Sequence, residues 1–237
     1  PVAGKPLLRW LVDGFKKQNV NDITVVGGYR ADAIDTAGIT LAINERHAET
    51  GELASLARVA NAFAHDTVVS YGDLLFRSYI VRDLVESDAD FTVAVDSTAA
   101  TTAHAANASV RDFAYCSAGD DRGLFGQRVL LEMISANAAH AGRAPNGRWI
   151  GLLVVRGDDA RARLLRVFAA LQARADFDGL GMPDLINALV ADGARIEVQY
   201  VHGHWAGVND MDEFRHAADF AHGQTPLGGT ATETPHD

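Results

Sequence analysis

The sequence predicts an α/β protein with a doubly wound, mostly parallel mixed sheet and a small antiparallel addition. In the first half of the 237-residue chain, short β-branched segments alternate with segments of helical periodicity. This alternation is typical of parallel strands joined by right-handed crossovers. In the second half, after Asp96, apolar segments are joined by turns rich in Gly, Asp and Asn. Such turns favour antiparallel pairing.

The first half opens with an amphipathic helix over 7–15, because its apolar residues recur at helical spacing and the run ends before the Asn- and Asp-rich residues 19–22. The β-branched residues 23–26 then predict a strand that stops at a glycine pair. The other elements of this half follow from the same two periods. They are a strand at 39–43, a helix at 52–63, a strand at 67–70, a helix at 79–85 and a strand at 91–95.

The second half begins with a Thr/Ala-rich segment, residues 97–109, which follows neither period and is predicted to be a loop or insertion. Apolar segments then predict strands, and two longer segments of helical spacing predict helices, one of which has Pro183 in its first turn. In order, these elements are strands at 110–116, 129–134 and 149–155, helices at 158–174 and 183–190, a strand at 196–201 and a helix at 211–221.

The chain is expected to form one domain over residues 1–222, followed by a disordered tail over 223–237 that is rich in Gly, Thr and Pro. Because the sequence opens at Pro1 without an initiator Met and enters the first helix almost at once, we expect the domain to be truncated at its N-terminus.

Composition excludes several classes of function. The chain has 21 Lys+Arg and 31 Asp+Glu, a net charge of −10, which argues against a nucleic-acid surface built on phosphate neutralisation. Cys116 is the only cysteine, so internal disulfides and multi-thiolate metal sites are excluded. Since no stretch approaches the roughly 20 apolar residues that span a bilayer, we expect a cytoplasmic protein without a membrane partner.

Chemistry is expected where the parallel strands end. Residues 27–30 lack the spacing of known phosphate-binding loops, so a plain turn is the favoured interpretation there. In Ser70-Tyr71-Gly72-Asp73, a strand runs into Gly72, which permits close backbone approach, and then into the carboxylate of Asp73. Asp73 could coordinate Mg²⁺ or could cap the next turn.

Two further segments lie at predicted strand or helix ends. Thr50, Gly51 and Ser55 could hold a base or an anion at a helix N-terminus, although a plain N-cap at Thr50 is the favoured alternative. His202 and His204 would share one strand face, but no third ligand with zinc spacing lies nearby. Asn209 and Asp210, which follow them, could be ligands or helix caps.

Taken in order, the segments resemble those of nucleotidyltransferases with a Rossmann-like GT-A fold. PVAGKPLLRWLVDGF is similar to the family segment that follows the Gly-rich signature loop, VVGGYRADAI to the second strand, and SYGDLLF to the metal-binding strand end. RWIGLLVV is similar to a later strand beside the substrate, and GHWAGVNDMDEF to the closing metal segment. The resemblance covers residues 1–221.

The resemblance implies a Mg²⁺ site formed by Asp73 and Asn209, with Asp210 as the alternative second ligand. The amide departs from the Asp that many relatives have at that place. The remaining residues carried over are the nucleotide- or substrate-binding Thr50, Gly51, Ser55 and Gly72, and Gly151, which would let the acceptor approach its strand. The family's Gly-rich loop with its Arg, and its Pro-Lys, are absent from this sequence.

The implied reaction is attack by a phosphate or phosphonate acceptor on the α-phosphorus of CTP, giving a CMP conjugate and pyrophosphate. INERHAETGELASL and YVHGHW most resemble cytidylyltransferases of phosphocholine and phosphonate metabolism, including the domain fused to phosphoenolpyruvate mutase. Without the signature loop, residues 1–237 alone are expected to be inactive. The alternatives are a sugar-1-phosphate nucleotidyltransferase, a catalytically silent nucleotide-binding domain, or a GT-A glycosyltransferase, whose usual Asp-x-Asp is missing here.

Overall fold

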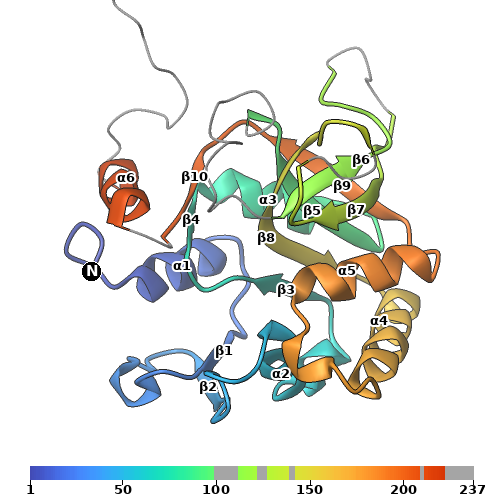
Figure 1. Cartoon of the computed structure of the whole chain (residues 1–237). Coiled ribbons are helices and arrows are strands. Elements are labelled where there is room, and N and C mark those ends of the chain that lie inside the picture. The colour runs from blue at the N-terminus through green and yellow to red at the C-terminus, as the bar shows by residue number, and fades with distance from the viewer. Residues whose placement is uncertain (99–111, 122–126, 139–141, 209–210, 222–237) are drawn as a thin grey trace, which may run out of the picture.

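A computed structural model describes residues 1–98, 112–121, 127–138, 142–208 and 211–221 of the chain. Its main sheet has six strands, in the order β7-β6-β8-β5-β9 with β3 also pairing with β8. Helices pack on this mixed sheet (Figure 1), so the α/β fold class is confirmed. The strands of the main sheet are β3 (Thr67–Ser70), β5 (Phe91–Asp96), β6 (Phe113–Cys116), β7 (Leu131–Ser135), β8 (Gly147–Val155) and β9 (Ile196–Val201).

Helices cover both faces of the main sheet, as the doubly wound prediction requires. α4 and α5 pack with Val93 and Leu153 on one face, whereas α1 and α3 pack with Ala94 and Leu152 on the other. Alternate residues of β5 and β8 thus serve two cores. The helices are α1 (Leu7–Lys16), α2 (Glu52–Ala57), α3 (Ser78–Glu86), α4 (Asp158–Gln172), α5 (Met182–Ala191) and α6 (Met211–Ala221). None of the helices in the described ranges is long and apolar enough to cross a membrane.

Two short strand pairs lie outside the main sheet. β1 (Thr24–Gly27) pairs in parallel with β2 (Thr40–Ile43), and β4 (Leu74–Phe76) pairs antiparallel with β10 (Trp205–Gly207). The sequence predicted both strands of the first pair, as members of the main sheet, but neither strand of the second. β4 and β10 have only three residues each, which is too few to show the two-residue period of a strand.

β8 occupies a different place from the one predicted. Residues 149–155 were expected beside 110–116 and 129–134 in an antiparallel addition, but β8 lies inside the sheet, antiparallel to β5 on one side and to β3 and β6 on the other. Eight of its nine residues are buried, and such a strand must be covered on both faces. The addition consists of β6 and β7, and the parallel pairs are β5–β9 and β1–β2.

The predicted helix at 52–63 is wrong beyond its first half. α2 ends at Ala57, and a 3₁₀ helix, η2 (Ala60–Ala64), follows it. Val59 between them has φ −129° and ψ 26°, outside the α-helical region. The β-branched Val59 and the nearby Asn61 have low helix propensity. The apolar spacing alone therefore predicted too long a helix. The predicted tail and most of residues 97–109 lie outside the described residues.

Candidate active site

Four strands of the main sheet meet at one edge. Ser70, the last residue of β3, pairs with Leu152, and Asp96, the last residue of β5, pairs with both Arg148 of β8 and Val201 of β9. The C-terminal end of β5 therefore lies beside the beginning of β8, β9 ends next to β5, and β3 ends beside the middle of β8. This edge is where open α/β sheets place their ligands.

Asp73 follows β3 at this edge and immediately precedes β4. The first residue of β4, Leu74, pairs with the last residue of β10, Gly207. Val208 after it leads directly to Asn209 and Asp210, which lie outside the described residues. The pairing thus brings the half-buried Asp73 beside the start of the segment predicted to supply the second metal ligand.

Gly72 and Gly151 differ in what surrounds them. A Cβ at Gly72 would have no protein atom within 4 Å, which leaves this exposed position open to a ligand. Gly151 has φ +88°, and a Cβ there would lie 2.5 Å from Cδ2 of Tyr71. Gly151 therefore makes room for an aromatic ring, and the expectation that the acceptor approaches the strand at this residue stays a prediction.

Tyr71 lies at this edge of the sheet and packs against both hydrophobic clusters, the one under α4 and α5 and the one under α1 and α3. Its ring contacts that of Trp149 edge-to-face, with centroids 5.2 Å apart, and its N–H donates to the carbonyl of Gly151 at 3.1 Å. Burial raises the pKa of the phenol far above its usual value, and the carboxylates of Asp112, Glu52 and Asp73 raise it further, whereas Arg148 opposes them. Tyr71 is therefore a neutral phenol surrounded by charged groups from four segments.

Asp96 connects the loops that follow β5 and β9. Its side chain is nearly fully buried and accepts four hydrogen bonds. Oδ1 accepts from the N–H and hydroxyl of Thr98, at 2.9 and 2.7 Å, and from the N–H of Gly203 at 3.1 Å. Oδ2 accepts from the indole N–H of Trp205 at 2.8 Å. Because Trp205 begins β10, this carboxylate fixes the strand that leads to Asn209.

The loop between β2 and α2 is organised by Asn44, a residue that the sequence analysis missed. Its buried amide donates to Thr50 Oγ1 at 2.9 Å and to Ser55 Oγ at 3.1 Å. The N-cap of α2 is Gly51, so the alternative of Thr50 as an N-cap is wrong. A polar residue directly after an apolar strand was the signal that could have singled out Asn44.

Gly51 holds this loop against the segment before α5. Its N–H donates to the carbonyl of Asp178 at 2.6 Å, and a Cβ there would collide with the carbonyl of Leu180. A cavity of about 210 Å³ opens beside Asn44 and Thr50, with the cationic Arg46 and Arg58 among its lining. The predicted nucleotide residues Thr50, Gly51 and Ser55 are thus brought together next to a cavity lined by two arginines, of which Arg46 is ion-paired with Asp178.

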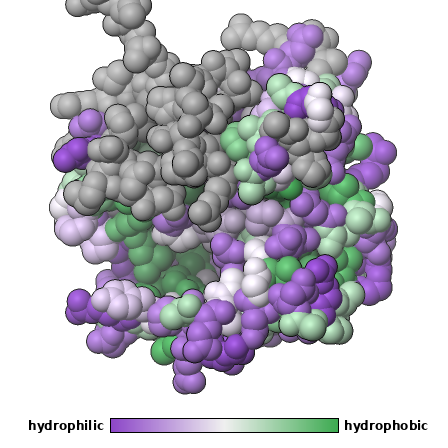
Figure 2. Space-filling model, in the orientation of Figure 1, coloured by the Kyte–Doolittle hydropathy of each residue, from purple (hydrophilic) through white to green (hydrophobic). Residues whose placement is uncertain are grey.

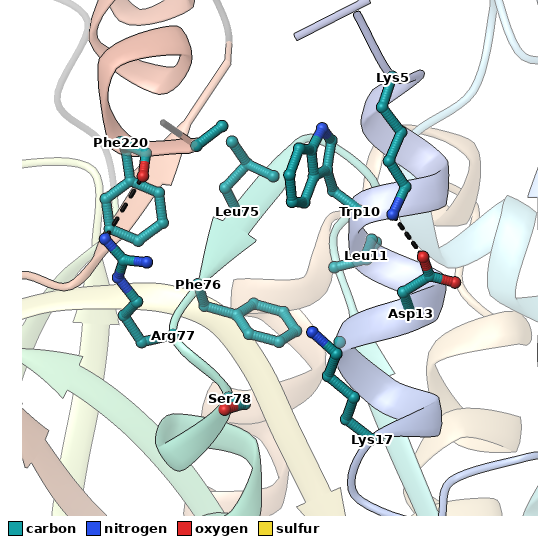
Figure 3. A pocket seen from close by; sticks show the side chains of 12 residues that line it. Lys5, Trp10, Leu11, Asp13, Lys17, Leu75, Phe76, Arg77, Ser78 and Phe220 are labelled. Carbon is teal, nitrogen blue, oxygen red and sulfur yellow. Dashed lines mark hydrogen bonds and ion pairs between the residues drawn. The ribbon is translucent and has the colours of Figure 1, made fainter. Parts of the chain in front are cut away.

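A second cavity, of about 180 Å³, lies between α1, β4 and α6. Figure 3 shows Trp10, Phe76 and Phe220 around it. Its Lys5 is ion-paired with Asp13, and the guanidinium of Arg77 lies over the ring of Phe220. This cavity was not predicted from the sequence. The face drawn in Figure 2 also has a hollow with a hydrophobic floor, between the β1–β2 pair and the rest of the molecule.

The two histidines after β9 do not converge on a common point. His202 Nε2 lies 2.7 Å from Oδ2 of Asp120, whereas His204 Nδ1 lies 3.0 Å from the hydroxyl of Tyr79. In the part of the chain that the structure describes, no group of three or more His, Cys, Asp or Glu side chains could hold a metal ion. The zinc interpretation therefore gains no support.

Mg²⁺ needs fewer protein ligands than zinc does. Mg²⁺ takes hard oxygen ligands and commonly uses one or two carboxylates, with phosphates and water completing its shell. Asp73 provides a carboxylate at the strand edge, and Asn209 and Asp210 follow β10 closely in the sequence. The donor types present fit this ion.

A family model described as "MobA-like NTP transferase domain" matches residues 1–166. A choline-phosphate cytidylyltransferase of Streptococcus pneumoniae is 28% identical over 90 residues. That match spans 36% of this chain and 39% of the relative's length.

The solved structures that share the fold include three nucleotidyltransferases. The CTP:phosphocholine cytidylyltransferase of S. pneumoniae has a TM-score of 0.71 at 15% identity, covering 93% of this chain and 87% of its own. The inositol-1-phosphate CTP transferase of T. maritima has a TM-score of 0.67 at 11% identity, covering 95% of this chain and 87% of its own. A UDP-glucose pyrophosphorylase of Acinetobacter baumannii has a TM-score of 0.66 at 12% identity, covering 92% of this chain and 82% of its own.

Proposed function

The chain belongs to the MobA-like NTP transferase domain family, and from this premise we propose that it transfers CMP from CTP to a small molecule that bears a phosphate or phosphonate group. Pyrophosphate is the second product. The observation that carries the proposal is the pairing of Leu74 with Gly207, which brings Asp73 to the segment leading to Asn209. The likeness to structures named as cytidylyltransferases supports the choice of CTP.

In the proposed reaction, an acceptor oxygen attacks the α-phosphorus of CTP in line with the departing pyrophosphate. The protein has little covalent chemistry to do, so positioning and charge compensation supply the rate. Asp73, with Asn209 or Asp210 as its partner, would hold Mg²⁺. When bound there, the ion neutralises charge that develops on the phosphate oxygens.

The residues around Asn44 are assigned to the nucleotide. Asn44 holds the side chains of Thr50 and Ser55 by hydrogen bonds, and Arg46 and Arg58 lie in the lining of the adjacent cavity. A preorganised polar loop with nearby cations suits a nucleoside phosphate, because it holds the anion without reorganising. Asp96 acts at a distance by fixing β10, and it is a positioning residue in this account.

Release of pyrophosphate tests the proposal. The protein expressed from its complete coding sequence is supplied with Mg²⁺, one of CTP, UTP or dTTP, and one of phosphocholine, 2-aminoethylphosphonate or glucose 1-phosphate. We expect release with CTP and either of the first two acceptors. Release restricted to glucose 1-phosphate with UTP or dTTP would assign the chain to the sugar-phosphate class instead. Absence of release in every combination would favour a silent nucleotide-binding domain.

A further inference from the structure

Among the residues that the structure describes, none offers a polar partner to the guanidinium of Arg148. Arg148 is half-buried near the start of β8, and its Cζ lies 5.1 Å from the centroid of the Trp205 ring. It donates no hydrogen bond and forms no ion pair within the described ranges of the chain, and its Nε is fully buried without an acceptor. A guanidinium carries five N–H donors, and leaving a buried one unpaired costs free energy.

Two other described arginines, Arg9 and Arg156, also have a buried Nε without a hydrogen bond. Both have partners for their remaining nitrogens: Arg9 donates to the carbonyls of Asp35 and Ala37, and Arg156 donates to the carbonyl of Val85. Arg148 differs from them because, among the described residues, its cation contacts the face of an indole and no hydrogen-bond acceptor. Trp205 fixes its plane and leaves its N–H groups for another acceptor.

Neighbouring carboxylates do not supply that acceptor. Asp96 pairs with Arg148 across the β5–β8 ladder, but its two oxygens already accept from Thr98, Gly203 and Trp205. Arg148 acts electrostatically on the Tyr71 hydroxyl together with Asp73, which places both charged groups around the same edge of the sheet. A cation that no described residue pairs with therefore lies in the region of the proposed metal ligand.

We propose that Arg148 binds the phosphate or phosphonate group of the acceptor substrate and so determines that the acceptor is an anion. The proposal rests on the proposed function and deepens it. A planar guanidinium matches such a group bidentately. A cation there also reduces the repulsion between the acceptor and the triphosphate as the two anions approach.

The location of Arg148 favours the acceptor over the nucleotide. Arg148 belongs to the wall formed by β5, β8 and β9. The residues assigned to the nucleotide, Thr50, Gly51 and Ser55, belong to the loop before α2 and to α2 itself. Binding by Arg148 should accordingly affect the KM of the acceptor and leave the KM of CTP unchanged.

The test compares Arg148→Gln, which removes the charge, with Arg148→Lys, which keeps the charge and loses the planar fork. Arg166→Gln on α4 is the matched control, since Arg166 is exposed and ion-paired with Asp192. We expect Arg148→Gln to raise the KM of phosphocholine or 2-aminoethylphosphonate about 10- to 100-fold. Arg148→Lys should have an intermediate effect, and Arg166→Gln none. Thermal unfolding establishes that each variant is folded.

A second readout is independent of turnover. Calorimetric titration of phosphocholine and of 2-aminoethylphosphonate, without CTP, measures acceptor binding directly, and we expect Arg148→Gln to weaken it by the same factor. An unchanged acceptor affinity in folded Arg148→Gln, or an increase in the KM of CTP alone, would overturn the assignment. A wild-type protein that binds these compounds through Arg148 but releases no pyrophosphate would contradict the proposed function and leave the binding role intact.

Discussion

Leu74 and Gly207 lie opposite each other in the antiparallel pair of β4 and β10, although they are far apart in the sequence. Both are buried, and the pair is only three residues long. Asp73 and Val208 lie just beyond this pair of residues. The position of the proposed Mg²⁺ site therefore depends on one short strand pair and on the contacts that hold it.

Asp73→Asn should abolish most of the activity while leaving the protein folded. A charged ligand is lost, so Mg²⁺ binding and charge compensation weaken, and we expect a loss of about 100-fold or more in kcat. A substitution at this half-buried strand end should change the free energy of unfolding by about 1 kcal/mol or less. Pyrophosphate release as a function of Mg²⁺ concentration, with urea unfolding in parallel, measures both. The control is Asp88→Asn, which changes an exposed carboxylate that is ion-paired with Arg128. An unchanged Mg²⁺ dependence in Asp73→Asn would refute the ligand assignment.

Asn209 and Asp210 can be distinguished by substitution. If Asn209 is the second ligand, Asn209→Ala should raise the Mg²⁺ concentration needed for half-maximal rate by about tenfold, because one oxygen donor is removed. Asp210→Ala should then have a smaller effect. The opposite order would assign Asp210, and equal, small effects would remove both from the site.

Asp96→Asn should destabilise the protein. The carboxylate accepts four hydrogen bonds, and the amide nitrogen of Asn, which is a donor, would face at least one of these four donors. Hydrogen bonds to a buried charged group contribute about 1.5–3 kcal/mol, so we expect the free energy of unfolding to fall by about 2–3 kcal/mol. Thr98→Val removes one hydroxyl donor and should cost about 1 kcal/mol. Urea unfolding compares the two. Equal stability of wild type and Asp96→Asn would mean that this carboxylate does not fix β10.

Gly151→Ala should be costly for two reasons: its φ of +88° disfavours an L residue, and the added Cβ meets the Tyr71 ring. Together these predict a loss of about 2–4 kcal/mol in the free energy of unfolding. Gly72→Ala is the matched control, because its Cβ would meet no atom within 4 Å. We expect it to change stability by about 0.5 kcal/mol or less. Equal effects of the two substitutions would contradict the packing role of Gly151.

Regular elements were predictable where one period dominates. The strands at 67–70 and 196–201 and the helix at 211–221 have the predicted bounds, because a β-branched run or a 3.6-residue repeat ends there at turn-forming residues. β4 and β10 have three residues each and carry no such signal. The position of β8 within the sheet could not be predicted, because it depends on which faces of this strand are buried, and burial is a property of the assembled sheet.

Site residues divide in the same way. Asp73 could be singled out because a carboxylate after a strand and a glycine is a local pattern. Arg148 could not, because what distinguishes it is tertiary: no residue that the structure describes offers its guanidinium an acceptor. For Asn44 the sequence holds a signal, a polar residue after an apolar strand, but it does not reveal the hydroxyls that Asn44 reaches across its loop. Local sequence indicates where a ligand can bind, and the folded environment decides which other groups reach it.

The most direct test of the central claim is the ³¹P NMR spectrum of the products formed from CTP and 2-aminoethylphosphonate or phosphocholine. Nucleotidyl transfer predicts equal amounts of pyrophosphate and of a CMP conjugate with a new P–O–P linkage, and Asp73→Asn should form neither. A spectrum that shows only CMP, only CDP with phosphate, or unchanged substrates would contradict the proposal that this chain is a cytidylyltransferase.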